Sequence, residues 1–328
     1  MLRTLLLRAS TSPTLARRLP RYRFVRRSVA RFMPGEMLED ALAAAERAAG
    51  SGIDAVLSRL GENVRCREDV ATAVEHYEAA IVSAGETNAD VQLSIKLTHL
   101  GLDIAHDLAA RNLDRLATLA AHAGTVVWVD MESSAYVDRT LDVFRGARHG
   151  HTNIGICLQA YLHRTDDDLD ALLADTHAIR LVKGAYAEPA DVARQGRNDI
   201  DTAYHRLAVR LLDATRAEAN DVAPRTPDAD AAPRTADPDA APRPVLGTHD
   251  TALLEKIGRD AEAAGVDRRA YEIQMLYGIR SADQVRLAAD GFAVRVFICY
   301  GPEWFPWFVR RLAERPANLM MLAKAIMP

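Results

Sequence analysis

Eight short apolar segments recur along this chain of 328 residues, and most of them end in a polar side chain. They are separated by segments rich in Ala, Leu, Arg and Glu, each long enough for a helix. This alternation is typical of a parallel βα architecture, and eight such units predict an α/β protein of the (β/α)8 barrel type. The apolar segments are residues 53–57, 91–96, 125–130, 154–159, 180–186, 245–249, 271–276 and 293–298.

Polar residues stand at or near the carboxyl ends of five of these predicted strands. A barrel gathers the carboxyl ends of its strands on one face, and active sites of this fold are found on that face. We therefore expect these side chains to converge on one site at the barrel mouth. They are Lys96, Asp130, Gln159, Lys183 and His249.

The overall composition favours one large core and a small-molecule partner. Hydrophobic residues make up 49% of the chain, which is enough to bury a single core of this length. The net charge of −4 argues against a general nucleic-acid-binding protein, which would present a basic face.

The three cysteines, Cys66, Cys157 and Cys299, form no CxxC pair, so the sequence indicates neither a zinc ribbon nor a disulfide framework. No apolar run approaches the roughly 20 residues that a membrane span requires. We predict a cytoplasmic protein in a reducing compartment, with peripheral attachment at the inner face of the membrane as an open alternative.

Two segments stand apart from the barrel pattern. Residues 1–35 hold nine arginines and no acidic residue, which resembles a transit peptide, but a basic arm or surface helix is favoured over that interpretation. Residues 219–244 repeat Ala-Pro-Arg-Thr and predict a disordered insertion after a helix that ends near Thr215. Residues 36–328 are then a single barrel domain with this insertion.

Lysine usage supports a site at the strand ends. The chain has only four lysines among its 41 basic residues, yet Lys96 and Lys183 both end predicted strands. For either lysine alone, a structural salt bridge, for example with Asp130, is an equally good interpretation. Near the C-terminus, residues 304–314 predict a helix that carries Arg310 and Arg311, a pair suited to binding a carboxylate if the helix crosses the barrel mouth. Without further context, a solvated helix face is the simpler explanation for such a pair.

Several motifs together resemble one known family. They are Ser94-Ile-Lys-Leu-Thr-His-Leu-Gly-Leu-Asp103, Asp130-Met-Glu, Leu158-Gln-Ala-Tyr-Leu, Arg180-Leu-Val-Lys-Gly-Ala-Tyr186, Thr248-His249-Asp250 and Arg310-Arg311. In this order they resemble the proline dehydrogenases, in particular the short monofunctional bacterial and archaeal enzymes. The resemblance is collinear from about residue 30 to residue 325, and the segment 219–244 is not part of the family pattern.

The resemblance implies a distorted (β/α)8 barrel that binds FAD, with its last helix over the barrel mouth. It also implies roles for individual residues, with Asp130 and Arg180 as catalytic residues and Arg180 acting electrostatically. The substrate carboxylate would bind Lys96, Arg310 and Arg311. The flavin would contact Met131, Gln159, Lys183, Gly184, Ala185, Thr248 and His249.

The implied reaction is hydride transfer from C5 of L-proline to FAD, which gives Δ1-pyrroline-5-carboxylate, followed by electron transfer to a membrane quinone. A pyrroline-5-carboxylate dehydrogenase would use the product. Tyr186 and Leu276 resemble apolar walls around the substrate ring, and two neighbouring positions depart from the family pattern, because Phe297 and Trp307 stand where a tyrosine is usual. Loss of these hydroxyls opens oxidation of 4-hydroxyproline or another cyclic imino acid as an alternative.

Two other classes of function remain as alternatives. A barrel aldolase would form a Schiff base on Lys183 or Lys96. A non-catalytic barrel would act as a sensor or scaffold and would tolerate loss of the Lys96 and Arg311 charges. His249 also has a simpler interpretation, in which a neighbouring backbone group satisfies its ring.

Overall fold

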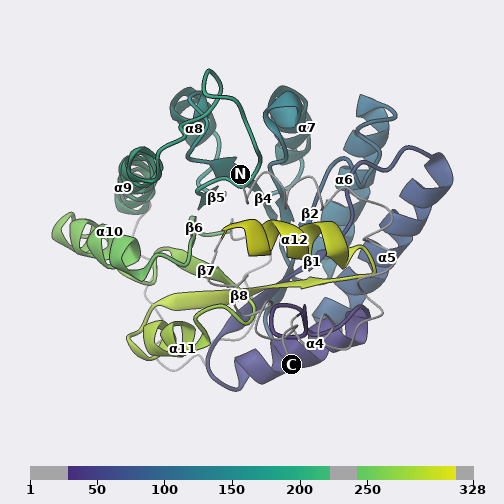
Figure 1. The fold of residues 1–328 in the computed structure, drawn as a ribbon, viewed down its shortest axis with the longest axis horizontal. Helices are drawn as coiled ribbons and strands as arrows, with labels where there is room; N and C mark the ends of the chain where they lie inside the picture. Colours follow the sequence, from purple (N-terminus) through teal and green to yellow (C-terminus); the bar gives the residue numbers. More distant parts are fainter. Residues whose placement is uncertain (1–28, 222–241, 315–328) are drawn as a thin grey trace, which may run out of the picture.

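The computed structural model describes residues 29–221 and 242–314 (Figure 1). Most of the basic segment 1–35 and of the predicted insertion 219–244 therefore lies outside the described residues. One boundary was wrong, because helix α9 runs Arg197–Asp221 and does not end near Thr215. The residues after Thr215 read Arg-Ala-Glu-Ala, all good helix formers, so the helix continues into the segment that we assigned to the insertion.

Eight strands alternate with helices in the described ranges. The strands are β1 Asp54–Arg59, β2 Val91–Ile95, β3 Val127–Val129, β4 Ile154–Gln159, β5 Ile179–Val182, β6 Val245–Gly247, β7 Glu272–Leu276 and β8 Ala293–Tyr300. The helices are α4 Leu38–Ala49, α5 Arg67–Glu86, α6 His106–His122, the short η2 Ser134–Tyr136, α7 Val137–Arg148, α8 Thr165–Leu173, α9 Arg197–Asp221, α10 Thr251–Ala263, α11 Ser281–Ala289 and α12 Trp304–Glu314. No helix in these ranges is long and apolar enough to cross a membrane.

The strands close into one parallel barrel in the order β1 to β8, which confirms the predicted fold class. β1 and β8 extend further than the apolar runs indicated, as far as Arg59 and Tyr300. The reason is their mutual pairing, which runs from Asp54 opposite Arg295 to Arg59 opposite Tyr300. This closing seam is a long-range pairing, so local composition does not reveal its length.

Helix α12 lies across the mouth of the barrel, as predicted, whereas the other helices surround the sheet (Figure 1). Pro306 is its third residue, a position where the missing backbone N–H costs nothing. Helix α4 packs outside β1 and β8, where a ring helix following β8 would otherwise lie. The place beside the seam is therefore taken, and α12 covers the open end of the barrel.

Residues 29–36 hold α12 in this position. Val29, Phe32 and Met33 are buried in an apolar cluster with aromatic residues of α12. The indole Nε1 of Trp304 donates a hydrogen bond to Glu36 Oε1 at 2.8 Å. Gly278 permits the close approach of this segment, because a Cβ there would lie 1.6 Å from the carbonyl oxygen of Arg31. The end of the basic segment thus forms part of the support for the last helix.

An ionic cluster around a buried arginine lies at the opposite end of the barrel. Arg295 is 3% exposed, and its Nε donates to Glu272 Oε2 at 2.9 Å. Its Nη1 donates to the backbone oxygens of Ala55 and Asp90, both at 2.9 Å. Arg295 also pairs with the carboxylates of Asp90 and Asp54. One guanidinium therefore pairs with three carboxylates at or just before strand starts and ties β1, β7, β8 and the residue before β2 together.

Replacing Arg295 by methionine should destabilise the fold by about 3–5 kcal/mol, because Glu272 would be left as a buried charge without compensation. The free energy of unfolding in denaturant measures the effect. Arg115→Met is the matched control, since Arg115 pairs with Glu78 on the surface, where a pair contributes about 1 kcal/mol or less. Equal losses in the two variants would contradict the assigned role of the cluster.

Candidate active site

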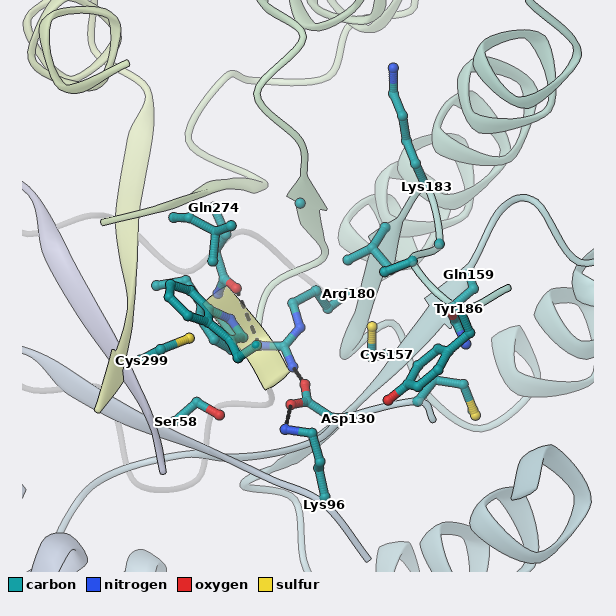
Figure 2. A pocket seen from close by; sticks show the side chains of 18 of the residues that line it. Ser58, Lys96, Asp130, Cys157, Gln159, Arg180, Lys183, Tyr186, Gln274 and Cys299 are labelled. Carbon is teal, nitrogen blue, oxygen red and sulfur yellow. Dashed lines mark hydrogen bonds and ion pairs between the residues drawn. The ribbon is translucent and has the colours of Figure 1, made fainter. Parts of the chain in front are cut away.

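A pocket of about 450 Å³ occupies the barrel mouth beneath α12 (Figure 2). Every strand contributes residues to its lining at or just beyond the strand's carboxyl end. Helix α12 adds Pro306 and Trp307, and Glu303 just before the helix completes the lining. The volume lies in the range of small-molecule and cofactor sites. The pocket is therefore where the sequence placed the site.

Most of the residues predicted for the site line this one pocket. They are Lys96, Asp130, Met131, Gln159, Arg180, Lys183, Gly184, Ala185, Tyr186, Thr248, His249, Leu276, Phe297 and Trp307. Arg310 and Arg311 belong to α12, which crosses the mouth, but their side chains lie outside the described residues.

Asp130 joins two cations inside the pocket. Lys96 Nζ lies 3.5 Å from Asp130 Oδ2, and Arg180 Nη2 donates a short hydrogen bond to Asp130 Oδ1 (Figure 2). Ser94 completes the group, because its Oγ donates to Asp130 Oδ1 at 2.9 Å and accepts from Arg180 Nη2 at 2.7 Å. We call Lys96, Asp130 and Arg180 the charge chain. With two cations and one carboxylate, it carries a net positive charge into the pocket.

Lys96 keeps its proton in this setting. Burial alone would lower the pKa of its ammonium group, but the carboxylates of Asp130, Glu62 and Glu132 outweigh burial and raise the pKa above its usual value. A lysine that stays charged binds a carboxylate well and is a poor Schiff-base nucleophile.

Arg180 is fixed from several sides. Its side chain is 2% exposed, and its guanidinium carbon lies 5.3 Å from the Trp128 ring centre and 5.2 Å from that of Phe297, both within cation–π range. Arg180 Nη1 donates to Gln274 Oε1 at 3.3 Å, and Gln274 Nε2 donates to Glu272 Oε1 at 2.7 Å. Since Glu272 pairs with Arg295, hydrogen bonds run from the charge chain to the ionic cluster at the base.

Lys183 lies at the outer edge of the pocket and points away from the charge chain in Figure 2. It pairs with Asp201 near the start of α9 and, at 3.0 Å, with Asp250, which caps the start of α10. Burial tends to raise the pKa of Asp250, but the hydrogen bond and charge of Lys183, together with hydrogen bonds from Leu253 and Arg197, outweigh burial and lower the pKa. The positive charge of Lys183 is therefore shared by two carboxylates. Lys183 does not act as an isolated cation in the pocket.

His249 and Gly184 have structural partners of their own. His249 Nε2 accepts a hydrogen bond from the backbone N–H of Leu276 at 2.9 Å, so a neighbouring backbone group satisfies this nitrogen, and the residue also lines the pocket. This bond occupies the lone pair that a general base would use. Gly184 has a φ of 111°, and a Cβ there would lie 2.1 Å from the ring of Tyr161. The glycine is required by backbone conformation and by this neighbour.

Glu132 is a buried residue to which the sequence analysis gave no role. Its side chain accepts hydrogen bonds from the backbone N–H of Thr98 at 3.1 Å and from Thr98 Oγ1 at 2.7 Å. Its backbone carbonyl accepts from Gln159 Nε2 at 2.7 Å, and Thr98 Oγ1 accepts from the N–H of Asn63 at 2.9 Å. Glu132 thus connects the loops after β1, β2 and β3 with the end of β4. The sequence signal that could have identified Glu132 is its position two residues after Asp130.

Pocket residues other than the predicted ones include Ser58, Cys157, Gln274 and Cys299. All four lie within strands and contribute either a hydroxyl, a thiol or an amide. Their inward orientation depends on strand register, which the sequence did not supply. In the described ranges no group of three His, Cys, Asp or Glu side chains is arranged to hold a metal ion.

Glu132 should make stability depend on pH. Burial raises the pKa of its carboxyl group from 4.5 to about 7 despite the hydrogen bonds from Thr98. The folded state thus binds the proton more tightly, so the stabilisation is full below pH 4.5 and is lost as pH rises through about 7. Glu132→Gln removes this titration, and the variant should gain up to about 3 kcal/mol relative to wild type between pH 5 and pH 8.

The measurement is the free energy of unfolding of both proteins at the two pH values. Comparing variant with wild type cancels other groups that titrate in this window, such as Asp54, whose pKa burial raises to about 6. A stability difference that is the same at both pH values would refute the assignment.

Comparison with known proteins agrees with this architecture. The family model described as proline dehydrogenase matches residues 41–324. Proline dehydrogenase 1 of Bacillus subtilis (strain 168) is 31% identical over 328 residues, which cover 100% of this chain and 99% of the relative. The proline dehydrogenase of Deinococcus radiodurans is 33% identical over 306 residues, 90% of this chain and 89% of the relative.

Among solved structures, proline utilization A from Bdellovibrio bacteriovorus, inactivated by N-propargylglycine, has a similar fold. It superposes with a TM-score of 0.75 at 21% identity, covering 91% of this chain and 34% of the larger protein. That comparison supports the barrel, and the sequence relatives support the family. The chain belongs to the proline dehydrogenase family.

Proposed function

We propose that this chain oxidises L-proline to Δ1-pyrroline-5-carboxylate with FAD as the bound electron acceptor. The observation that carries the proposal is the charge chain, a protonated lysine and a buried arginine that share one aspartate at the barrel mouth. The family supplies the reaction class, and the charge chain supplies a fitting site for a small anionic substrate.

The substrate side of the pocket suits an imino acid. Lys96 presents an ammonium group that stays charged, and Asp130 holds it in place. Leu276, Phe297 and Trp307 line the same pocket and offer apolar surface for a five-membered ring. Lys96 would bind the carboxylate, and the proposal adds Arg310 and Arg311 from the helix that crosses the mouth.

We assign the flavin to the part of the pocket that Arg180 and Gln159 line. The donor set includes the Arg180 guanidinium and the Gln159 amide, and the volume of about 450 Å³ accepts an aromatic ring system beside a small substrate. When bound, FAD supplies the acceptor for the hydride that leaves C5 of proline. Arg180 would stabilise the negative charge that develops in that transfer, and it is held for this task by Asp130, Trp128 and Phe297. Met131, Lys183, Gly184, Ala185, Thr248 and His249 complete the proposed lining.

The proposal extends to the partners of the reaction. Proline loses its amine proton as well as the hydride, and water in the pocket is the proposed acceptor, because Lys96 is already protonated and the His249 Nε2 lone pair is occupied. Electrons would pass to a membrane quinone, which calls for a peripheral contact of a cytoplasmic protein with the membrane. A pyrroline-5-carboxylate dehydrogenase would take the product.

The direct test is an absorption spectrum of the FAD-reconstituted protein before and after anaerobic addition of L-proline. The oxidised flavin bands should appear and then bleach. Borohydride in the presence of a keto acid should trap no adduct, since Lys96 is charged and Lys183 is paired with two carboxylates. Bound flavin that proline leaves oxidised would refute the substrate, and a trapped adduct would favour the aldolase alternative.

Lys96→Met should lower kcat/KM for L-proline by at least about 30-fold, because a charge-assisted contact to the substrate is lost and Asp130 loses one partner. Steady-state kinetics with an artificial electron acceptor measures the loss. Lys256→Met is the matched control, since Lys256 is an exposed residue of α10, and it should retain wild-type kinetics. Similar kinetics for both variants would exclude Lys96 from substrate binding.

Phe297 gives a test of substrate preference. Its ring lies beneath the Arg180 guanidinium, at a position where the family usually has a hydroxyl. We expect kcat/KM for L-proline to exceed that for 4-hydroxy-L-proline, and Phe297→Tyr to alter that ratio while retaining flavin bleaching by proline. A wild-type enzyme that prefers hydroxyproline would overturn the assignment of proline as the substrate.

A further inference from the structure

Ser58 places a buried hydroxyl in the pocket, on the one strand next to both β2 and β8. In the strand register it lies opposite Ser94 of β2 and Cys299 of β8. The residue is 1% exposed and belongs to the pocket lining. In Figure 2 its oxygen points into the pocket, in the direction of the ion pair between Lys96 and Asp130.

This hydroxyl has no hydrogen-bond partner among the described residues, whereas its neighbour Ser94 donates to Asp130 and accepts from Arg180. Ser58 Oγ is not one of the fully enclosed unpaired polar atoms of the described residues, so it stays accessible from the pocket. A serine kept in that state at the wall of a pocket is suited to a partner that arrives with the bound molecule.

The position of Ser58 identifies the part of the substrate that it would meet. Lys96 follows Ser94 by two residues, so both side chains lie on the same face of the adjacent strand, and Ser58 is level with Ser94. A carboxylate held by Lys96 has about four lone-pair sites, more than one ammonium group fills. On the neighbouring strand β1, the Ser58 hydroxyl is a donor that lines the same pocket.

We infer that Ser58 donates a hydrogen bond to the carboxylate of the bound imino acid, beside Lys96, and so helps the pocket select ring amines that carry a carboxylate. The inference rests on the proposed function, since it requires a cyclic imino acid as the substrate. It adds a neutral donor from β1 to the charged groups that the family resemblance implies.

The experiment compares the wild type with Ser58→Ala and Ser58→Thr in the full, FAD-reconstituted chain. Ser58→Ala should raise KM for L-proline by roughly tenfold or more, the usual effect of losing a hydrogen bond to a charged group. Competitive inhibition by pyrrolidine, which lacks the carboxylate, should stay unchanged. Ser58→Thr keeps the hydroxyl and should recover most of the affinity for proline.

Thr140 provides a matched control. It is fully buried on α7, its Oγ1 also lacks a hydrogen-bond partner, and it lies outside the pocket. Thr140→Val should keep or raise the melting temperature, because it removes a buried unpaired hydroxyl. Ser58→Ala should leave the melting temperature nearly unchanged, because its hydroxyl faces the pocket, and only Ser58→Ala should change KM. A purely structural role for Ser58 would lower the melting temperature and weaken proline and pyrrolidine alike.

Two results would overturn the inference while leaving the proposed function intact. One is an unchanged KM for proline in Ser58→Ala when proline bleaches the wild-type flavin. The other is an effect confined to 4-hydroxy-L-proline, which would assign the hydroxyl to the ring substituent instead. A wild-type protein that proline does not bleach overturns the proposed function and this inference with it.

Discussion

Asp130 is shared by two cations within the barrel mouth, and the geometry of the site depends on this sharing. Arg180 is almost fully buried and reaches Asp130 from β5, while Lys96 approaches it from the end of β2. In a low-dielectric interior, removal of one member of such a group leaves the others with uncompensated charge. The lysine, the aspartate and the arginine therefore stabilise one another, and three strands must be in register for them to meet.

The rest of the fold supports this arrangement from both ends. Below it, hydrogen bonds through Gln274 and Glu272 connect Arg180 to the ionic cluster around Arg295. Above it, α12 covers the mouth and is itself held by the aromatic cluster with residues 29–36. At the side, Glu132 fixes the loop that carries Lys96 to the end of β4. Each support joins elements that are distant in sequence.

Much of the fold and of the candidate site could be predicted from the sequence, because strand periodicity and the polar residue at a strand end are local signals. The eight strands, the helix over the mouth and most of the pocket lining follow from them and from the family motifs. Ser58 was missed because the apolar run stops at Leu57, whereas pairing with β8 extends β1 to Arg59. We predicted Lys183 as a cation of the site, but in the fold it pairs with Asp201 of α9 and with Asp250, which caps the start of α10. These features depend on which distant segments pack together, and no local pattern encodes that.

The most direct measurement is an anaerobic titration of the FAD-reconstituted Asp130→Asn variant with L-proline, followed by flavin absorbance. Asparagine keeps the shape and can still bond to Ser94, but it removes the charge that Lys96 and Arg180 share. We expect the variant to fold and to bind flavin, yet to require at least about 100-fold more proline for bleaching than the wild type. Bleaching at wild-type proline concentrations would contradict a site organised around that aspartate.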